Sequence, residues 1–225
     1  STFINNTALN SAYGGGAIIE WEPNDSKYIK VINSKFESNT VNGNGGAVSG
    51  MGKGDVNITN STFTDNTANI NGGAVHSENG NVNIMDSNFI DNTATNIGGA
   101  IYGNKNTNIQ NSNFTNNLAL EMGGAVYGVG NVNVKDSNFL NNTAINNNGG
   151  AIYGNNNVVV VSNSNFTNNT AVRGGAIYDI NKVEVDSSNF TNNTESTIFM
   201  GEGHIVDSEF VSSALPMVYV NKDLS

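Results

Sequence analysis

The sequence contains no cysteine, two prolines and a single arginine, Arg173, and charged residues make up 12% of its 225 residues. The absence of cysteine excludes disulfide bonds and thiolate metal sites. A net charge of -10 with so few basic side chains argues against a nucleic acid partner, because phosphate binding depends on clustered Lys and Arg. No apolar run approaches the roughly 18 residues of a membrane-spanning helix, so we expect no direct membrane insertion in this fragment.

Asparagine, by contrast, makes up about a fifth of the residues, and glycine occurs 26 times. Such low hydrophobicity would favour disorder if the apolar residues were scattered. They recur instead at a fixed period, in two motifs. Gly-Gly-Ala followed by Ile or Val occurs with its alanine at Ala17, Ala47, Ala74, Ala100, Ala125, Ala151 and Ala176. The pattern F-x-x-N begins at Phe3, Phe36, Phe63, Phe89, Phe114, Phe139, Phe166 and Phe190, and Phe210 keeps the position without the asparagine.

Between these motifs apolar residues alternate with polar ones, as in Val82-Asn83-Ile84, which is the two-residue period of a strand. Clusters of glycine and asparagine, which tolerate the left-handed backbone of sharp corners, separate the alternating stretches. Units of about 25 residues with three short strands leave no room for a helix, and each must stack on its neighbours to bury its apolar face. The sequence therefore predicts one all-β domain over residues 1–225, a right-handed parallel β-helix of about eight to nine coils cut from a larger protein.

Stacked coils turn each position of the unit into a row of equivalent residues along the rod. Serine stands two residues before each of the nine repeat phenylalanines, so alternation places both side chains on the inner face. A small hydroxyl that bonds nearby backbone suits an internal corner, and the phenylalanines fill the core. We expect the asparagines of F-x-x-N to form a ladder of stacked amides with a structural role rather than a ligand-binding one.

Parallel β-helices also serve polysaccharide lyases and glycosidases, whose sites need paired carboxylates, a calcium cluster or a basic residue. Asp65 and Asp91 occupy equivalent positions in adjacent units, but the following units carry asparagine there. His76 and His204 lie in distant units and have no evident partner. We therefore predict that the chain is not an enzyme, with no catalytic residue, no metal site and no cofactor; lyase or glycosidase activity is the alternative.

Two further functions stay open. A threonine follows most F-x-x-N motifs, which is compatible with ice binding, but Leu118 interrupts this row and we expect it at a turn rather than on a flat strand. The chain would otherwise be a purely structural spacer.

A row of tyrosines and one loop supply the candidate binding residues. Two residues after the alanine of the glycine motif stand Tyr102, Tyr127, Tyr153 and Tyr178, which form an outward row if the intervening residue points inward. Exposed rings at strand spacing would stack on sugar rings or anchor a protein, whereas rings stacked on one another would stiffen the sheet. Trp21 lies in an insertion of the longest unit, and insertions in solenoids often form loops on a binding face.

The paired Gly-Gly-Ala-[Ile/Val] and F-x-x-N motifs resemble the repeat of chlamydial polymorphic outer-membrane proteins, and equally that of adhesin-like proteins of methanogenic archaea. The resemblance extends from Phe3 to about Phe210, and the asparagine-rich, cysteine-free, acidic composition is more similar to the archaeal group. It implies a cell-surface, extracellular β-helix used in adhesion, without catalytic residues. The expected partner is accordingly a host or neighbouring cell surface, through a glycan or a protein.

Overall fold

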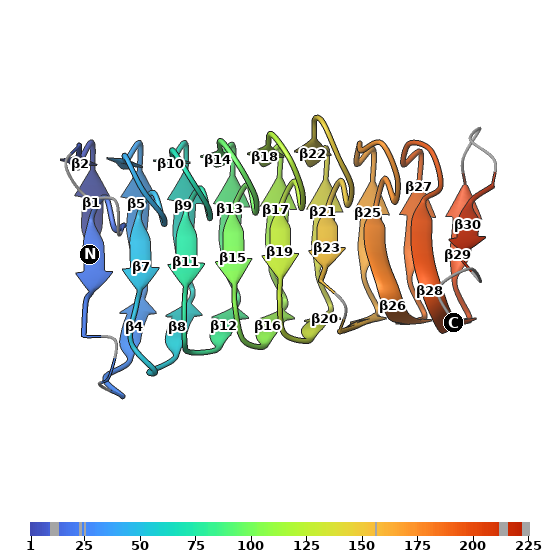
Figure 1. Cartoon of the computed structure of the whole chain (residues 1–225), viewed down its shortest axis with the longest axis horizontal. Coiled ribbons are helices and arrows are strands. Elements are labelled where there is room, and N and C mark those ends of the chain that lie inside the picture. The colour runs from blue at the N-terminus through green and yellow to red at the C-terminus, as the bar shows by residue number, and fades with distance from the viewer. Residues whose placement is uncertain (10–13, 23, 25, 156, 212–215, 222–225) are drawn as a thin grey trace.

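The computed structural model describes residues 1–9, 14–22, 24, 26–155, 157–211 and 216–221. Figure 1 shows a rod of stacked coils that runs from the N-terminus at one end to the C-terminus at the other. Within the described residues all strand pairs are parallel, no residue is helical, and hence no helix is long and apolar enough to cross a membrane. The predicted parallel β-helix is confirmed.

The strands form three sheets that run along the rod. The nine-stranded sheet carries the phenylalanines and contains β1 (Thr2–Ile4), β5 (Lys35–Glu37), β9 (Thr62–Thr64), β13 (Asn88–Ile90), β17 (Asn113–Thr115), β21 (Asn138–Leu140), β25 (Asn165–Thr167), β27 (Asn189–Thr191) and β29 (Glu209–Val211). The six-stranded sheet contains β2 (Thr7–Ala8), β6 (Thr40–Val41), β10 (Thr67–Ala68), β14 (Thr93–Ala94), β18 (Leu118–Ala119) and β22 (Thr143–Ala144).

The 15-stranded sheet has two arms that merge in the long strands near the C-terminus. One arm follows the glycine motif and contains β3 (Ile18–Glu20), β7 (Val48–Gly50), β11 (Val75–Ser77), β15 (Ile101–Gly103), β19 (Val126–Gly128) and β23 (Ile152–Gly154). The other contains β4 (Ile29–Ile32), β8 (Val56–Thr59), β12 (Val82–Met85), β16 (Thr107–Gln110), β20 (Val132–Lys135) and β24 (Val158–Ser162). The remaining strands are β26 (Ile177–Asp186), β28 (Ile198–Val206) and β30 (Val218–Val220).

Two details differ from the sequence-based expectation. The described strands make about seven turns, slightly fewer than eight to nine, and β22 is the last strand of the six-stranded sheet. A complete coil also has four strands rather than three, since the two residues after F-x-x-N form a short strand of their own. From Thr7 to Thr143 the threonine row therefore lies on these short strands and not at a turn, whereas Thr170 forms an isolated bridge and Thr194 lies at a bend.

The phenylalanines form a continuous stack through the core. Neighbouring rings lie 4.6–5.0 Å apart between centroids and within 7° of parallel, from Phe3 to Phe210. Inward aliphatic side chains from both arms of the large sheet pack around this stack. Each fully buried large apolar side chain stabilises the fold by about 1.5–3 kcal/mol relative to its exposed state, so the stack is a main source of cohesion between coils.

The asparagines of F-x-x-N form the predicted ladder, and each one between Asn39 and Asn169 connects three coils. Asn66 is fully buried, and its amide nitrogen donates to Asn92 Oδ1 at 2.9 Å and to the carbonyl of Phe36 at 3.2 Å. Its own Oδ1 accepts from the backbone N–H and the amide of Asn39, at 3.1 and 2.9 Å. Both amide hydrogens and both lone pairs of the oxygen are thus used, which removes the cost of burying a polar group.

The serines before each phenylalanine form a second inner ladder. Ser87 donates its hydroxyl to the carbonyl of Met85 at 2.8 Å and accepts the backbone N–H of Ser61 at 3.1 Å. The residue before each such serine has a positive φ, as at Asp86 and Asn111, and so does the residue before each ladder asparagine. Asn and Asp adopt this left-handed backbone more readily than other non-glycine residues, which explains why they interchange at the corners.

The two glycines of the repeat have different tasks. At Gly72 φ is +63°, a conformation that favours glycine. At Gly73 a Cβ would lie 2.0 Å from the carbonyl oxygen of Gly99 in the next coil and 2.7 Å from the main chain of Thr93. The second glycine therefore permits close approach of adjacent coils, and it couples the glycine motif of one coil to the short strand that follows F-x-x-N in the next.

Replacing Asn117 by Ala should lower the free energy of unfolding by about 2–4 kcal/mol, because Asn92, Asn142 and the carbonyl of Phe89 each lose a buried hydrogen-bond partner. The matched control is Asn113→Ala, which removes an exposed amide of the same coil and should change stability by less than about 0.5 kcal/mol. Urea unfolding followed by circular dichroism measures both. Equal losses in the two variants would contradict the role given to the buried ladder.

Candidate functional site

The predicted tyrosines lie in one row along the rod. Tyr102, Tyr127, Tyr153 and Tyr178 occupy register-matched positions on β15, β19, β23 and β26, and the preceding Ile or Val points into the core as expected. Neighbouring tyrosine rings stack at centroid distances of 5.6, 5.0 and 5.2 Å. The stack continues in what we call the aromatic row: His76, Tyr102, Tyr127, Tyr153, Tyr178, Phe199 and Tyr219.

The rings of the aromatic row are less exposed than an open sugar-stacking surface requires. Tyr127 and Tyr178 are each 7% exposed, and Tyr102 and Tyr153 are half-buried. Burial raises the pKa of all four phenols, that of Tyr153 to about 12. Because the faces of the inner rings lie against one another, their edges and hydroxyls are what remains for a partner. Self-stacking thus describes the geometry, while binding by these residues stays a prediction.

Trp21 lies apart from the tyrosines. It follows β3 directly and is 48% exposed. At the position that holds the tyrosines in later coils, the first three coils carry Ile19, Ser49 and His76, so three coils separate Trp21 from the first tyrosine. The carboxylate of Glu20 accepts the backbone N–H of Glu22 at 2.8 Å and that of Gly52 at 2.6 Å, which fixes the start of the insertion. Residues 23 and 25 of the predicted loop, 20–26, lie outside the described residues.

His76 has partners that the sequence did not reveal. Its Nδ1 lies 3.3 Å from Ser49 Oγ, its Nε2 lies 3.2 Å from Glu78 Oε2, and its ring stacks on Tyr102 at 4.9 Å. The hydrogen bond with His76 lowers the pKa of the Glu78 carboxyl, against the opposing effect of burial. The expectation that the histidines lack partners is therefore wrong for His76. Ser49 lies in register with His76 in the preceding coil, and Glu78 follows His76 by two residues on the same outward face. The pairing with Ser49 becomes visible only when the register of the coils is known.

The order serine, histidine, carboxylate resembles the arrangement of a hydrolase triad. A nucleophile must, however, reach the atom that it attacks, and Ser49 is 0% and His76 1% exposed. The cluster therefore closes one end of the aromatic row with satisfied polar groups, and it has no access for a substrate. Asp65 and Asp91 are exposed corner residues with positive φ, and no three acidic or histidine side chains of the described part gather to hold a metal ion.

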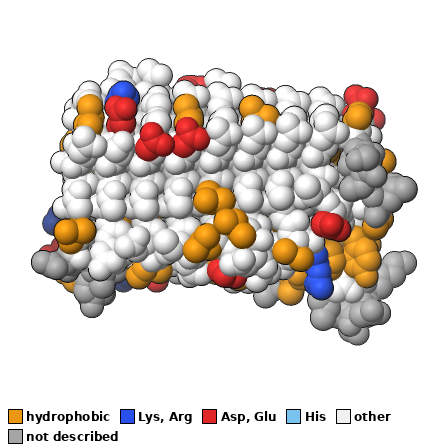
Figure 2. All heavy atoms as spheres, turned by 90° about the horizontal axis from the view of Figure 1, so that it is seen from above, with side chains coloured by type: hydrophobic (Ala, Val, Ile, Leu, Met, Phe, Trp, Pro, Cys, Tyr) orange, Lys and Arg blue, Asp and Glu red, His pale blue; other side chains and the backbone are white. Residues whose placement is uncertain are grey.

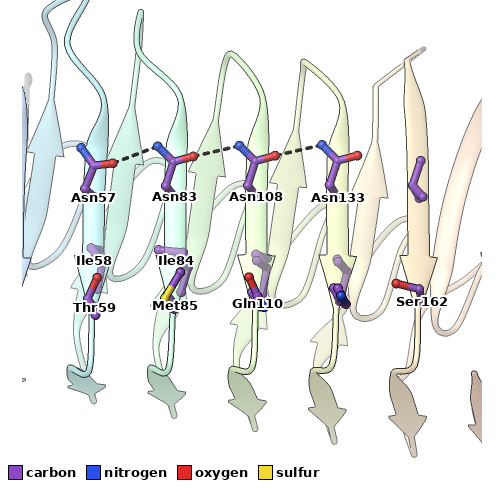
Figure 3. A pocket seen from close by; sticks show the side chains of 14 residues that line it. Asn57, Ile58, Thr59, Asn83, Ile84, Met85, Asn108, Gln110, Asn133 and Ser162 are labelled. Atoms are coloured by element: carbon purple, nitrogen blue, oxygen red, sulfur yellow. Dashed lines mark hydrogen bonds between the residues drawn. The ribbon is translucent and has the colours of Figure 1, made fainter.

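A groove that the sequence did not suggest runs across the outer face of β8, β12, β16, β20 and β24 (Figure 3). One wall is a row of amides, here called the groove asparagines: Asn57, Asn83, Asn108 and Asn133. The other wall carries the residues two positions further along each strand: Thr59, Met85, Gln110, Lys135 and Ser162. The residues between the walls have buried side chains, so their main chain forms the floor.

The groove asparagines are held by one another. The amide nitrogens of Asn83, Asn108 and Asn133 each donate to the Oδ1 of the asparagine in the preceding coil at 2.8–2.9 Å, which Figure 3 shows as a continuous chain. Asn133 pairs with Val160 in the next coil, where the row ends. A signal for this row was present in the sequence, because these asparagines are the central residues of stretches such as Val82-Asn83-Ile84 and point outward by alternation.

Asp179 places a buried carboxyl at a strand position that most other coils fill with glycine. Asp179 pairs in register with Gly154 on one side and Met200 on the other, and it is fully buried. Its Oδ1 accepts the backbone N–H of Asn181 at 2.6 Å, whereas Oδ2 has no hydrogen-bond partner within the described residues. Burial raises the pKa of Asp179 from 3.8 to about 6, although backbone N–H groups oppose the shift.

Comparison with known proteins identifies the repeat. Residues 60–78, 86–104, 136–155 and 163–179 each match the Chlamydia polymorphic membrane protein repeat. Each segment contains the corner residues, the ladder asparagine, the two glycines and one residue of the aromatic row of its coil, so these four coils match the polymorphic membrane protein repeat. No curated protein and no solved structure matches the chain. The similarity to archaeal adhesin-like proteins stays a prediction.

The buried carboxyl predicts a pH dependence of stability. Because the pKa of Asp179 is higher in the folded chain, the folded state binds a proton that the unfolded state releases between about pH 4 and pH 6, and stability falls as the pH rises through this window. Asp179→Asn should therefore exceed the unsubstituted chain in free energy of unfolding by about 1–3 kcal/mol at pH 7.5, with little difference at pH 4. Urea unfolding across this range tests it; a difference that does not change with pH would refute it.

Proposed function

We propose that the chain is a cell-surface, adhesin-type module that supports attachment to other cells or glycans. The carrying observation is the set of four polymorphic membrane protein repeats, stacked in register in a parallel β-helix. The matched repeat is that of a polymorphic membrane protein of Chlamydia, and an elongated module of this kind would extend away from the surface that bears it.

The surface of the rod supports binding better than catalysis. The face seen in Figure 2 consists mainly of uncharged polar side chains and main chain, with charged and hydrophobic side chains in small separate groups. The groove contains no acidic residue, so it offers no carboxyl as a general acid, base or nucleophile. The triad-like cluster at His76 is inaccessible to a substrate. Together these observations favour recognition over bond cleavage.

Attachment by the isolated chain can be measured directly. Beads coated with the folded chain should bind to cells of a mixed panel several-fold more than beads coated with albumin. The second control is a set of beads coated with the unfolded chain. These beads should not attach, because a binding surface assembled from many coils is lost on unfolding. Equal retention of folded-chain beads and albumin beads by every cell type would refute the proposal.

The residues predicted for binding can be tested in the same assay. Trp21→Ala should reduce bead attachment by about twofold or more, because it removes the large exposed ring of the insertion. Tyr102→Phe with Tyr153→Phe should do likewise, since these changes keep the stack and remove two hydroxyls at the edge of the aromatic row.

Val206→Ala is the matched control for Trp21→Ala, because Val206 is exposed to a similar degree at the other end of the rod. Attachment that stays unchanged in the tryptophan and tyrosine variants would remove these residues from the binding surface and leave the attachment role to other parts of the rod.

A further inference from the structure

We propose that the groove on β8, β12, β16 and β20 is a binding site for an extended, uncharged oligosaccharide that lies along the rod. This inference rests on the proposed attachment function and names the site and the class of ligand. Three features carry it: the hydrogen-bonding capacity left on the groove asparagines, the absence of acidic residues, and the fixed spacing of the row.

Within the row, Asn108 leaves half of its hydrogen-bonding capacity unused, whereas near the first end the amides of Asn57 and Asn83 also donate to the carbonyl and the Oδ2 of Asp55, each at 3.4 Å. Asn108 donates one amide hydrogen to Asn83 and accepts one from Asn133, at 2.8 and 2.9 Å. A primary amide has two hydrogens and two lone pairs, so one hydrogen and one lone pair of Asn108 have no protein partner within the described residues. The mutual hydrogen bonds hold each amide in place before a ligand arrives, which reduces the entropy lost on binding.

This pattern suits sugar hydroxyls. A hydroxyl both donates and accepts, and neighbouring hydroxyls of a pyranose ring can use the N–H and the C=O of one amide at the same time. Adjacent coils of a parallel sheet repeat at about 4.8 Å, which is similar to the length of one sugar unit in an extended chain. Consecutive sugars can therefore lie beside consecutive amides of the row. The opposite wall adds the hydroxyls of Thr59 and Ser162, the amide of Gln110 and the apolar side chain of Met85.

The charge of the groove selects against ionic ligands. The chain carries 19 acidic residues, yet none of the fourteen residues that line the groove is acidic, and Lys135 is its single basic residue. Nucleic acids and sulfated glycans need several basic side chains to offset their charge. A peptide strand gains its main-chain hydrogen bonds at the edge of a sheet, whereas the floor of the groove is a sheet face whose main chain is already paired. A neutral glycan is the ligand class that remains.

The ends of the row limit the length of the ligand. Before Asn57 the register places Lys30, and beyond Asn133 it places Val160 and then Glu184. The uninterrupted amides therefore span four coils, and we expect affinity to increase with chain length up to about four sugar units and to change little beyond that.

The experiment is calorimetric titration of the full chain with cellohexaose, chitohexaose and mannohexaose, preceded by an array of neutral and anionic oligosaccharides. At least one neutral hexasaccharide should bind, and its tetrasaccharide should bind about as well, whereas its disaccharide should bind at least tenfold more weakly. A heparin hexasaccharide should show no binding. Absence of binding to every neutral oligosaccharide of the array, or preference for the heparin hexasaccharide, would overturn the inference.

Asn83→Val with Asn108→Val tests the site itself. Valine already occupies this row at Val160, so the outer face of the sheet accommodates it, and thermal unfolding checks that the variant is folded. The double variant should bind the hexasaccharide at least tenfold more weakly, because two amides are lost. The matched control, Asn113→Val with Asn138→Val, removes two exposed amides that are linked in the same way on the neighbouring sheet and should leave affinity unchanged.

The assignment of the groove would be overturned if both double variants lost affinity equally, or if neither lost affinity. The bead assay separates this result from the proposed function. If the beads attach to cells but no oligosaccharide binds, the groove inference alone is contradicted. If beads that carry the unsubstituted folded chain do not attach to cells, the attachment function is contradicted.

Discussion

The structure depends on one constraint: an amide buried in a β-helix must use all of its hydrogen-bonding groups. Asn66 meets this requirement through Asn39 and the carbonyl of Phe36 in the preceding coil and through Asn92 in the following one. If two coils shifted by one residue, amides and carbonyls would separate within a dry core, at a cost of about 1–3 kcal/mol for each group left unpaired. The ladder therefore fixes the register of the entire rod, and every other row of residues inherits that register.

Close contact between coils follows from the same register. The phenylalanine rings stack at 4.6–5.0 Å because their strands are held in line, and the second glycine of each motif must lack a Cβ because a main-chain carbonyl of the next coil would lie 2.0–2.1 Å from it. The repeat thus joins parts that are far apart within one coil. The glycine motif of one coil contacts the short strand after F-x-x-N in the next, so neither motif can change alone. Asp179 departs from the pattern, because a carboxyl stands where Gly154 stands one coil earlier.

Much of this architecture is predictable from the sequence, because inward positions repeat the same residue and alternation reveals their direction. The ladder asparagines, the phenylalanine stack and the inward serines belong to this class. Contacts on the outer face are less accessible, since the residues there vary from coil to coil. Ser49, His76 and Glu78 come together through an offset of one coil and two residues, and no repeated motif marks that offset. The two-residue strands escaped prediction for a different reason, because a pair such as Thr67-Ala68 is too short to show a period.

The same side chain serves structure and recognition in different ways, depending on which face of the sheet it occupies. Inside the rod, an asparagine amide forms four hydrogen bonds and has nothing left to offer a ligand. Outside, an amide such as Asn108 forms two within its row and presents the remaining hydrogen and lone pair to the groove. Asparagine is therefore abundant for two separate reasons, and mutation of an inner and an outer member of the same repeat separates them. Where Val160 replaces the outer asparagine, the coil keeps its register, so the register of that coil does not depend on an outer amide.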